Sequence, residues 1–143
     1  MISVGAACLL IVRPTDLHVL TVSRKNQINR LGLPGGKWEE DDASSIHTAC
    51  RETEEETGVI VLVQHCEHVY TGAAYGSTSH ICSTYYATKY DDRNLGQKEP
   101  GMFVGWAFFE QLLGPDAPFA EYNKRLHDRY QRICLELLSR RTA

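Results

Sequence analysis

Apolar and polar positions along the chain predict several short strands. Residues 3–12 are almost wholly apolar and predict a buried strand, and residues 17–23 alternate and predict a second one. Residues 24–37 contain three glycines and one proline, which favours a loop. Further strands are predicted over residues 59–70, 79–90 and 102–109.

Two longer segments carry the period of an amphipathic helix. The first is predicted to start after an N-cap at Ser44 or Ser45 and to run to about Thr57, because Gly58 is a natural stop. The second covers residues 119–140, where an apolar stripe recurs at helical spacing: Phe119, Tyr122, Leu126, Tyr130, Ile133 and Leu137. Strands with one helix between them and one at the end predict a single mixed α/β domain over residues 1–143.

Net charge and the N-terminus exclude several function classes. The formal net charge is −3, so no broad basic surface exists and duplex nucleic acid is not expected as a main partner. The apolar run from Val4 to Val12 is too short to span a membrane, and no positively charged segment precedes it. We therefore expect no membrane partner and no signal peptide, with the cytoplasm as the default location.

Cysteine and histidine spacing does not indicate a zinc site. The chain has five cysteines, an odd number, and no pair has C-x-x-C spacing. Buried reduced thiols are therefore expected rather than a disulfide framework. His65 and His68 are three residues apart in a predicted strand, where they would point to opposite faces and could not readily share an ion.

The most unusual stretch is RETEEETG, residues 51–58, at the end of the first predicted helix. Glu52, Glu55 and Glu56 fall on one sector of that helix, whereas Glu54 points away. Each like-charged pair costs a few tenths of a kcal/mol, and negative charge at a helix C-terminus costs roughly 0.3–1 kcal/mol more. A divalent cation would offset this repulsion, and carboxylates without His or Cys favour Mg²⁺ or Mn²⁺. A solvated acidic face is the alternative that these residues alone leave open.

A glycine-rich turn precedes this helix. Gly35 and Gly36 let the backbone approach a ligand closely, although such a turn is weak when taken alone. Together, LPGGKWEEDDASSIHTACRETEEETGV resembles the Nudix box, the signature of the Nudix hydrolases. The second half of the box is matched closely by Arg51, Glu52, Glu55, Glu56, Gly58 and Val59, with Thr53 in place of a hydrophobic residue. The first half is one residue longer than the pattern, so Asp42 or Asp41 is expected at the first acidic position.

The resemblance covers nearly the whole chain and is greatest to the MutT-type nucleotide triphosphate diphosphatases. It implies a Nudix-type α/β/α sandwich with a mixed β-sheet, a catalytic helix after the Gly-rich loop and a C-terminal amphipathic helix. Enzymes of this family cleave a diphosphate linkage in a nucleotide with divalent cations. The resemblance therefore implies a nucleotide substrate and Mg²⁺ or Mn²⁺ as cofactor. A homodimer is a further expectation, because small Nudix proteins are often dimers.

The resemblance also implies roles for acidic residues. Glu52, Glu55 and Glu56 are the expected metal ligands, joined by the backbone carbonyl of Gly36. Glu55 or Glu56 is also the expected base for the attacking water. Glu99 is a candidate ligand or base downstream of the box.

Basic and aromatic residues near the box are the candidates for substrate contact. Arg51 is expected to orient a glutamate, which its i+4 spacing to Glu55 supports independently. Arg24, Lys25 and Lys37 are the basic residues nearest the box and are expected to meet phosphates. Trp38 is a candidate for stacking on a base, although packing is favoured for it.

Three function classes stay open on the sequence. The first is a diphosphatase that converts a nucleoside triphosphate, including an oxidised one, to the monophosphate and pyrophosphate. The second is a hydrolase of another nucleotide, such as a diadenosine polyphosphate, for which Tyr75 is a weak indicator; the coenzyme A pattern is matched only in fragments (Leu20-Thr21, Arg24, Arg30). The third is a non-catalytic nucleotide-binding domain, which would not need to keep all three glutamates of the box.

Overall fold

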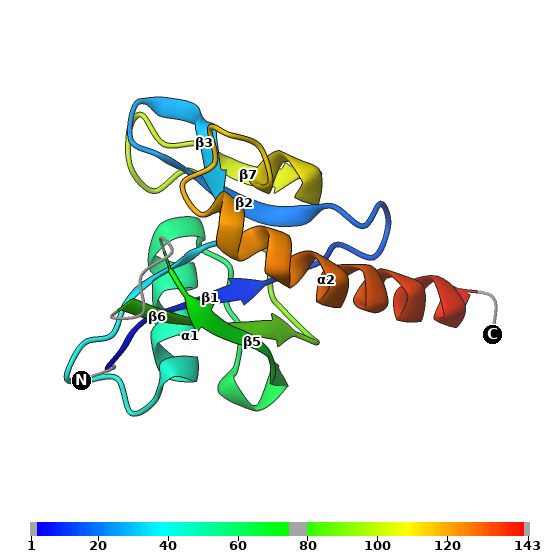
Figure 1. Cartoon of the computed structure of the whole chain (residues 1–143), viewed down its shortest axis with the longest axis horizontal. Helices are drawn as coiled ribbons and strands as arrows, with labels where there is room; N and C mark the ends of the chain where they lie inside the picture. Colours follow the sequence, from blue (N-terminus) through cyan, green and yellow to red (C-terminus); the bar gives the residue numbers. More distant parts are fainter. Residues whose placement is uncertain (1–2, 75–79, 142–143) are drawn as a thin grey trace.

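Two β-sheets and two long helices make up the computed structural model, which describes residues 3–74 and 80–141 (Figure 1). The strands are β1 (Ser3–Leu10), β2 (Val19–Arg24), β3 (Gln27–Gly32), β4 (Gly35–Lys37), β5 (Cys66–Ala73), β6 (His80–Ala87) and β7 (Val104–Ala107). The helices are α1 (Ser45–Thr57) and α2 (Ala120–Arg141), with short 3₁₀ turns η1 (Val63–His65) and η2 (Phe109–Leu112). One sheet has the order β4-β1-β6-β5 and the other the order β3-β2-β7.

The larger sheet is mixed, as predicted. Strands β1 and β6 run parallel, whereas β4 pairs with β1 and β5 pairs with β6 in the antiparallel sense. The smaller sheet is antiparallel throughout. A parallel pair requires a long crossover, and α1 lies within the chain segment that joins β1 to β6.

Strand β1 and the residues that follow it lie between two core clusters, one packed against α1 and the other against α2. Ala7, Leu9 and Ile11 pack in the cluster that includes Ala49 of α1. Leu10 and Val12 pack in the cluster that includes Leu126, Tyr130 and Ile133 of α2. Successive strand residues point to opposite faces, so this apolar run is buried on both sides. The predicted α/β/α sandwich is confirmed.

Both predicted long helices are confirmed. Helix α1 ends at Gly58, whose φ of 81° is left-handed and whose N–H donates to the carbonyl of Glu54. Ser44 occupies the N-cap position, but its hydroxyl pairs with Nδ1 of His47 rather than with the backbone. Helix α2 buries its predicted stripe at Tyr122, Leu126, Tyr130 and Ile133, and its C-terminal half extends beyond the sheets (Figure 1).

The loop predicted over residues 24–37 is wrong, because β3 and β4 lie inside it. Asn26 forms the hairpin turn before β3 with a φ of 59°, a conformation that asparagine tolerates. The first four residues of β3 are exposed, so no apolar alternation marks the strand. In β4, a Cβ on Gly35 would collide with the carbonyl of Ala7, so this glycine permits close strand pairing.

The strand predicted over residues 59–70 is wrong in its first half. Ile60 makes only an isolated bridge to Asp91, η1 follows, and β5 begins at Cys66. Val59 and Val61 are buried, so this apolar run is core without being a sheet strand. The strands predicted over residues 79–90 and 102–109 are present but shorter, as β6 and β7.

The cysteine environments differ from the expectation of buried thiols. Cys134 is buried, whereas Cys8, Cys50, Cys66 and Cys82 are partly exposed, and all five are free thiols. Among the described residues, no helix combines the length and apolar character needed to cross a membrane.

Candidate active site

The guanidinium of Arg51 forms hydrogen bonds with glutamates of α1, with the turn before the helix and with β4. Nη1 of Arg51 donates to Oε1 of Glu52 at 3.0 Å and to Oε2 of Glu55 at 3.2 Å. Nε and Nη2 donate to the two carboxylate oxygens of Asp42 at 2.9 and 3.0 Å. Nη2 also donates to the carbonyl of Lys37 at 3.2 Å, which joins α1 to β4. Arg51 therefore orients two glutamates of the cluster and stays cationic, because its partners raise its pKa.

Asp42 is the acidic residue that anchors Arg51. Its side chain is 4% exposed and also accepts hydrogen bonds from the backbone N–H of Glu39 and the hydroxyl of Thr48. The Arg51 guanidinium, followed by these donors, holds the pKa of Asp42 well below its usual range. Asp41, the alternative at this position, is exposed. The structure thus distinguishes the two aspartates that the sequence left open.

Glu56 is the carboxyl of the cluster that burial affects most. Its Oε1 accepts the backbone N–H of Gly35 at 2.8 Å. Burial raises the pKa of Glu56 to about 7; the Gly35 hydrogen bond acts in the lowering direction, and the charges of Glu52, Glu55 and Glu99 add to the rise. Near neutral pH, and without a cation beside it, this carboxyl is therefore divided between its protonated and ionised forms.

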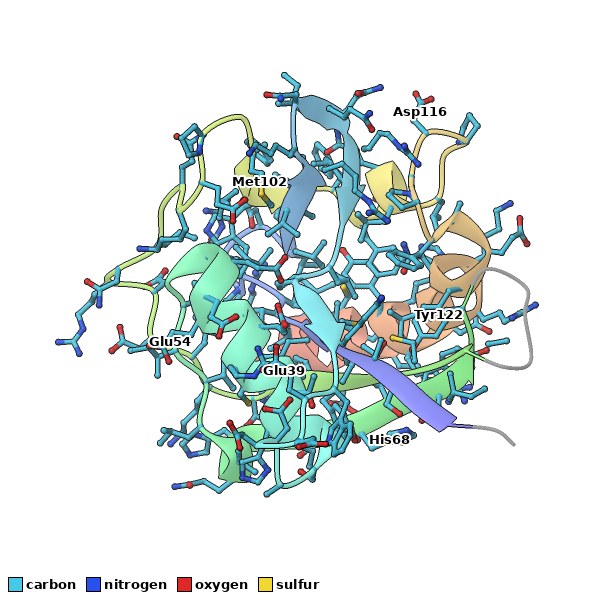
Figure 2. All side chains as sticks on the ribbon, turned by 90° about the vertical axis from the view of Figure 1, so that its left-hand side faces the viewer. Glu39, Glu54, His68, Met102, Asp116 and Tyr122 are labelled. Atoms are coloured by element: carbon cyan, nitrogen blue, oxygen red, sulfur yellow. The ribbon has the colours of Figure 1, made fainter. Side chains whose placement is uncertain are left out.

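Gly36 brings the backbone of β4 against Glu52. A Cβ at this position would lie within 2.7 Å of both carboxylate oxygens of Glu52, so only glycine fits here without moving that side chain. Burial also raises the pKa of Glu52. By contrast, Glu55 is 58% exposed, and the exposed Glu54 lies at the outer side of α1 in Figure 2.

The carboxylates of Glu52, Glu55 and Glu56 do not point toward one common position where a metal ion could bind. In the described part of the chain, no group of three or more His, Cys, Asp or Glu side chains is placed to hold a metal ion together. Glu52 and Glu55 face Arg51, and Glu56 faces Gly35. The donors are nonetheless hard oxygen atoms on one helix, the kind of ligand that Mg²⁺ prefers.

A cleft of about 570 Å³ adjoins this cluster. Glu56 and residues 35–37 lie at one part of its lining, and Arg24, Lys25 and Arg30 line another part from the β2–β3 hairpin. Further side chains line it from the loop before β7 and from the start of α2, including Met102 and Tyr122, both labelled in Figure 2. A cleft with acidic and basic parts can hold a polyanion bridged by cations.

Comparison with known protein families identifies this arrangement. Residues 2–130 match the family described as NUDIX domain. The chain belongs to the Nudix family. The match covers both sheets, α1 and the first half of α2, so the acidic helix and the cleft lie inside the Nudix domain.

Individual relatives agree with this assignment. The chain is 42% identical over 60 residues to the mitochondrial coenzyme A diphosphatase NUDT8 of Mus musculus, a match of 41% of this chain and 29% of that protein. A MutT protein from Bacillus halodurans has a TM-score of 0.62 at 21% identity, over 85% of this chain and 78% of that one. A structure described for MutT from Aliivibrio salmonicida and Vibrio cholerae has a TM-score of 0.58 at 20% identity. The match covers 96% of this chain and 98% of that one. At these identities the two MutT structures establish a shared fold.

The sequence-predicted residues fall into two adjoining groups. The first group lines the cleft and comprises Arg24, Lys25, Gly36, Lys37 and Glu56. The second comprises Arg51 with Glu52 and Glu55, which both accept hydrogen bonds from it beside the cleft.

Trp38 is 48% exposed, does not occur among the described residues that line the cleft, and donates its indole N–H to the carbonyl of Asp42. Packing on this turn fits that geometry better than base stacking. Glu99 is exposed in the segment before β7, near enough for its charge to affect Glu56. Tyr75 lies outside the described residues.

Part of the cleft could not be inferred from the sequence. Phe119, just before α2, and Asn123, in its first turn, line the cleft. Cys8 and Cys82 line it from β1 and β6. Phe119 belongs to the apolar stripe that predicts the helix, so its position suggested only core packing. Asn123 is 3% exposed and donates to the carbonyl of Leu112, and a polar residue beside an apolar stripe is the one available signal for it.

Proposed function

We propose that this Nudix chain hydrolyses a diphosphate linkage in a nucleotide, with Mg²⁺ or Mn²⁺ as cofactor. The preferred substrate in this proposal is a nucleoside triphosphate, including oxidised or non-standard ones, which yields the monophosphate and pyrophosphate. The observation that carries the proposal is one cleft lined by Glu56, residues 35–37 and the basic hairpin residues Arg24 and Lys25. Such a cleft can hold a phosphate chain between cationic side chains and the acidic helix.

The residues of the acidic helix fit a hard divalent cation. Glu52, Glu55 and Glu56, with the carbonyl of Gly36, would hold it, since these are the oxygen donors that Mg²⁺ and Mn²⁺ prefer. When bound, such cations offset phosphate charge and lower the pKa of water. The proximity of Gly36 to Glu52 and the raised pKa of Glu56 support this set.

Individual side chains are proposed for proton transfer, for positioning and for phosphate binding. Glu56 is the proposed proton acceptor, because it is the glutamate of the cluster that lines the cleft, where the attacking water would lie. Glu55, more exposed and bonded to Arg51, is the alternative base. Arg51 acts as a positioning residue through Glu52 and Glu55. Arg24, Lys25 and Lys37 are the proposed phosphate contacts, and Glu99 is the proposed additional acidic residue.

A second candidate substrate is coenzyme A, which also contains a diphosphate linkage. It is favoured by the 42% identity over 60 residues to the mouse mitochondrial coenzyme A diphosphatase NUDT8. Arg24 and Arg30, which match fragments of the coenzyme A pattern, both line the cleft. A homodimer and a cytoplasmic location remain predictions from the sequence.

A substrate panel tests the proposal. The protein is incubated with Mg²⁺ or Mn²⁺ and, separately, with normal and oxidised nucleoside triphosphates, a diadenosine polyphosphate and coenzyme A. Pyrophosphate from triphosphates supports the preferred substrate, and adenosine 3′,5′-diphosphate from coenzyme A supports the second candidate. ATP or ADP from the dinucleotide indicates a polyphosphate hydrolase. No turnover of any of them with either metal contradicts an enzymatic role and leaves a nucleotide-binding domain.

A further inference from the structure

Two thiols lie in contact between α1 and the start of β5. Sγ of Cys50, in α1, is 3.6 Å from Sγ of Cys66, the first residue of β5. Both side chains are partly exposed, so small molecules can reach them. Neither residue occurs among the described residues that line the cleft, and neither has a part in the proposed hydrolysis.

The contacts of the pair hold the two sulfurs beside each other. Each sulfur is 3.6 Å from the other, and in disulfide chemistry a thiolate is the nucleophile that attacks a neighbouring sulfur. Sγ of Cys66 also lies 3.6 Å from the carbonyl of Leu62, the residue that precedes η1.

We propose that Cys50 and Cys66 form an oxidisable dithiol site, in which a peroxide or a low-molecular-weight disulfide links α1 to β5. With hydrogen peroxide, the thiolate of one cysteine attacks one oxygen, and a sulfenic acid and, after proton uptake, water result. The thiol of the other cysteine then attacks the sulfenic sulfur and releases a second water. Overall, two thiols and one peroxide give one disulfide and two waters, and the protein loses two hydrogen atoms. With glutathione disulfide, the products are the protein disulfide and two reduced glutathione molecules.

The geometry of the pair is compatible with this bond. A disulfide has an S–S length of about 2.05 Å, so the sulfurs must approach each other by roughly 1.5 Å. Side-chain rotation at two partly exposed positions can supply much of this approach. The cross-link would join residues 16 apart in sequence and would tie the residue before Arg51 to the sheet.

The other thiols provide internal comparisons. Cys8 and Cys82 lie on the neighbouring strands β1 and β6, where Cys8 pairs with the hydroxyl of Thr84 at 3.0 Å. They are the competing pair in any oxidation. Cys134 is buried on α2 and is the matched control for loss of one cysteine.

Peptide mapping of the intact chain tests the site directly. The protein is treated with one equivalent of hydrogen peroxide or with glutathione disulfide, free thiols are alkylated, and the chain is digested with trypsin. Cleavage after Lys37, Arg51 and Lys89 places Cys50 in the peptide 38–51 and Cys66 in the peptide 52–89. We expect these two peptides to be linked, with fragmentation assigning the bond to Cys66 and leaving Cys82 alkylated. Dithiothreitol should separate them.

The variants make the result decisive. Cys134→Ser should form the link as the wild type does, whereas Cys50→Ser and Cys66→Ser should not. A link only between Cys8 and Cys82, a glutathione adduct on Cys50 or Cys66 without a cross-link, or unchanged thiols would each overturn the proposal. The wild-type map alone decides the question if a variant does not fold. The readout is independent of nucleotide hydrolysis, so its failure is distinguishable from failure of the proposed function.

Discussion

Arg51 and Asp42 form a two-bond ion pair, with Nε 2.9 Å from Oδ1 and Nη2 3.0 Å from Oδ2. The pair connects the turn before α1 with the end of the helix that carries the glutamates. Because the same guanidinium also bonds Glu52 and Glu55, the position of these carboxylates depends on a residue that lies outside the cleft lining. We therefore propose that Asp42 is a positioning residue within the Nudix box.

Replacing Asp42 should therefore lower activity without removing any group that contacts substrate. We expect Asp42→Asn to reduce kcat by roughly 10- to 100-fold, the usual effect of removing a group that orients a metal ligand. It should also lower Tm, because a buried acceptor of several hydrogen bonds is weakened. Asp41→Asn, at the exposed neighbour, is the control and should change neither value. Equal effects of the two substitutions would contradict this assignment.

The glutamates of α1 should differ sharply in their importance. Glu56→Gln should reduce kcat by at least about 100-fold, because it removes the proposed base and one ligand. The metal-free protein should be no less stable, since one repulsive charge has been removed. Glu54→Gln makes the same chemical change on the exposed side of the same helix and should retain wild-type turnover. Near wild-type activity of Glu56→Gln would disprove the role given to this residue.

Gly36 should be needed for full activity for a steric reason. A Cβ there would meet the carboxylate of Glu52, the free end of a flexible side chain that can move aside. We therefore expect Gly36→Ala to stay folded but to lose activity by about tenfold or more, and to need a higher Mg²⁺ concentration. Gly114→Ala is the control, because nothing lies within 4 Å of a Cβ at that position. Circular dichroism and a Mg²⁺ titration of activity separate folding from metal use.

The buried carboxyl of Glu56 predicts how stability changes with pH in the metal-free protein. Its pKa is raised from 4.5 to about 7 in the folded state, so the folded chain holds a proton that the unfolded chain has released between these values. Stability should therefore fall as pH rises from about 4.5 to 7, by on the order of 3 kcal/mol, and then level off. A carboxylate whose pKa is lowered by folding would give the opposite trend, because it makes the protein less stable as the pH falls.

Thermal unfolding with EDTA at pH 5 to 8 measures this dependence. Wild type should lose several degrees of Tm across the window, and Glu56→Gln should lose fewer, because it cannot titrate there. Saturating Mg²⁺ should abolish the decline, since a cation favours the ionised form. If wild type and Glu56→Gln had parallel pH profiles, another group would be the source.

The sequence predicted the parts of this molecule that are governed by local rules. The period of the apolar stripe located α2, and Gly58 located the end of α1. Helical geometry alone separated Glu54 from the other three glutamates. Each of these inferences uses residues within one or two helical turns of each other, so no knowledge of the fold was needed.

The features that were missed depend on tertiary contacts. Strands β3 and β4 lack apolar alternation because β3 is largely exposed and β4 has only three residues, two of them glycines. The choice of Asp42 over Asp41 required the position of Arg51, nine residues away in the sequence. Asn123 lines the cleft because the start of α2 lies beside the cleft in the folded chain. No local sequence pattern indicates this tertiary relation.

The basic residues of the hairpin should control substrate binding rather than chemistry. Arg24 lines the cleft, and its guanidinium lies 6.0 Å from the ring of Phe119, beside the segment that leads into α2. A hydrogen bond to a charged group contributes about 1.5–3 kcal/mol, so Arg24→Ala should raise KM by about tenfold or more while kcat changes little. Added salt should raise the wild-type KM more than that of the variant, because one screened attraction is gone.

Arg93 provides the matched control for this substitution. It is exposed, pairs with Asp91 and does not occur among the described residues that line the cleft. Arg93→Ala also removes one positive charge, so it separates a local contact from a change in net charge. We expect its KM and salt dependence to match those of the wild type. If both variants raised KM equally, Arg24 would act through the overall field of the protein; if Arg24→Ala lowered kcat alone, the residue would act on the reaction rather than on binding.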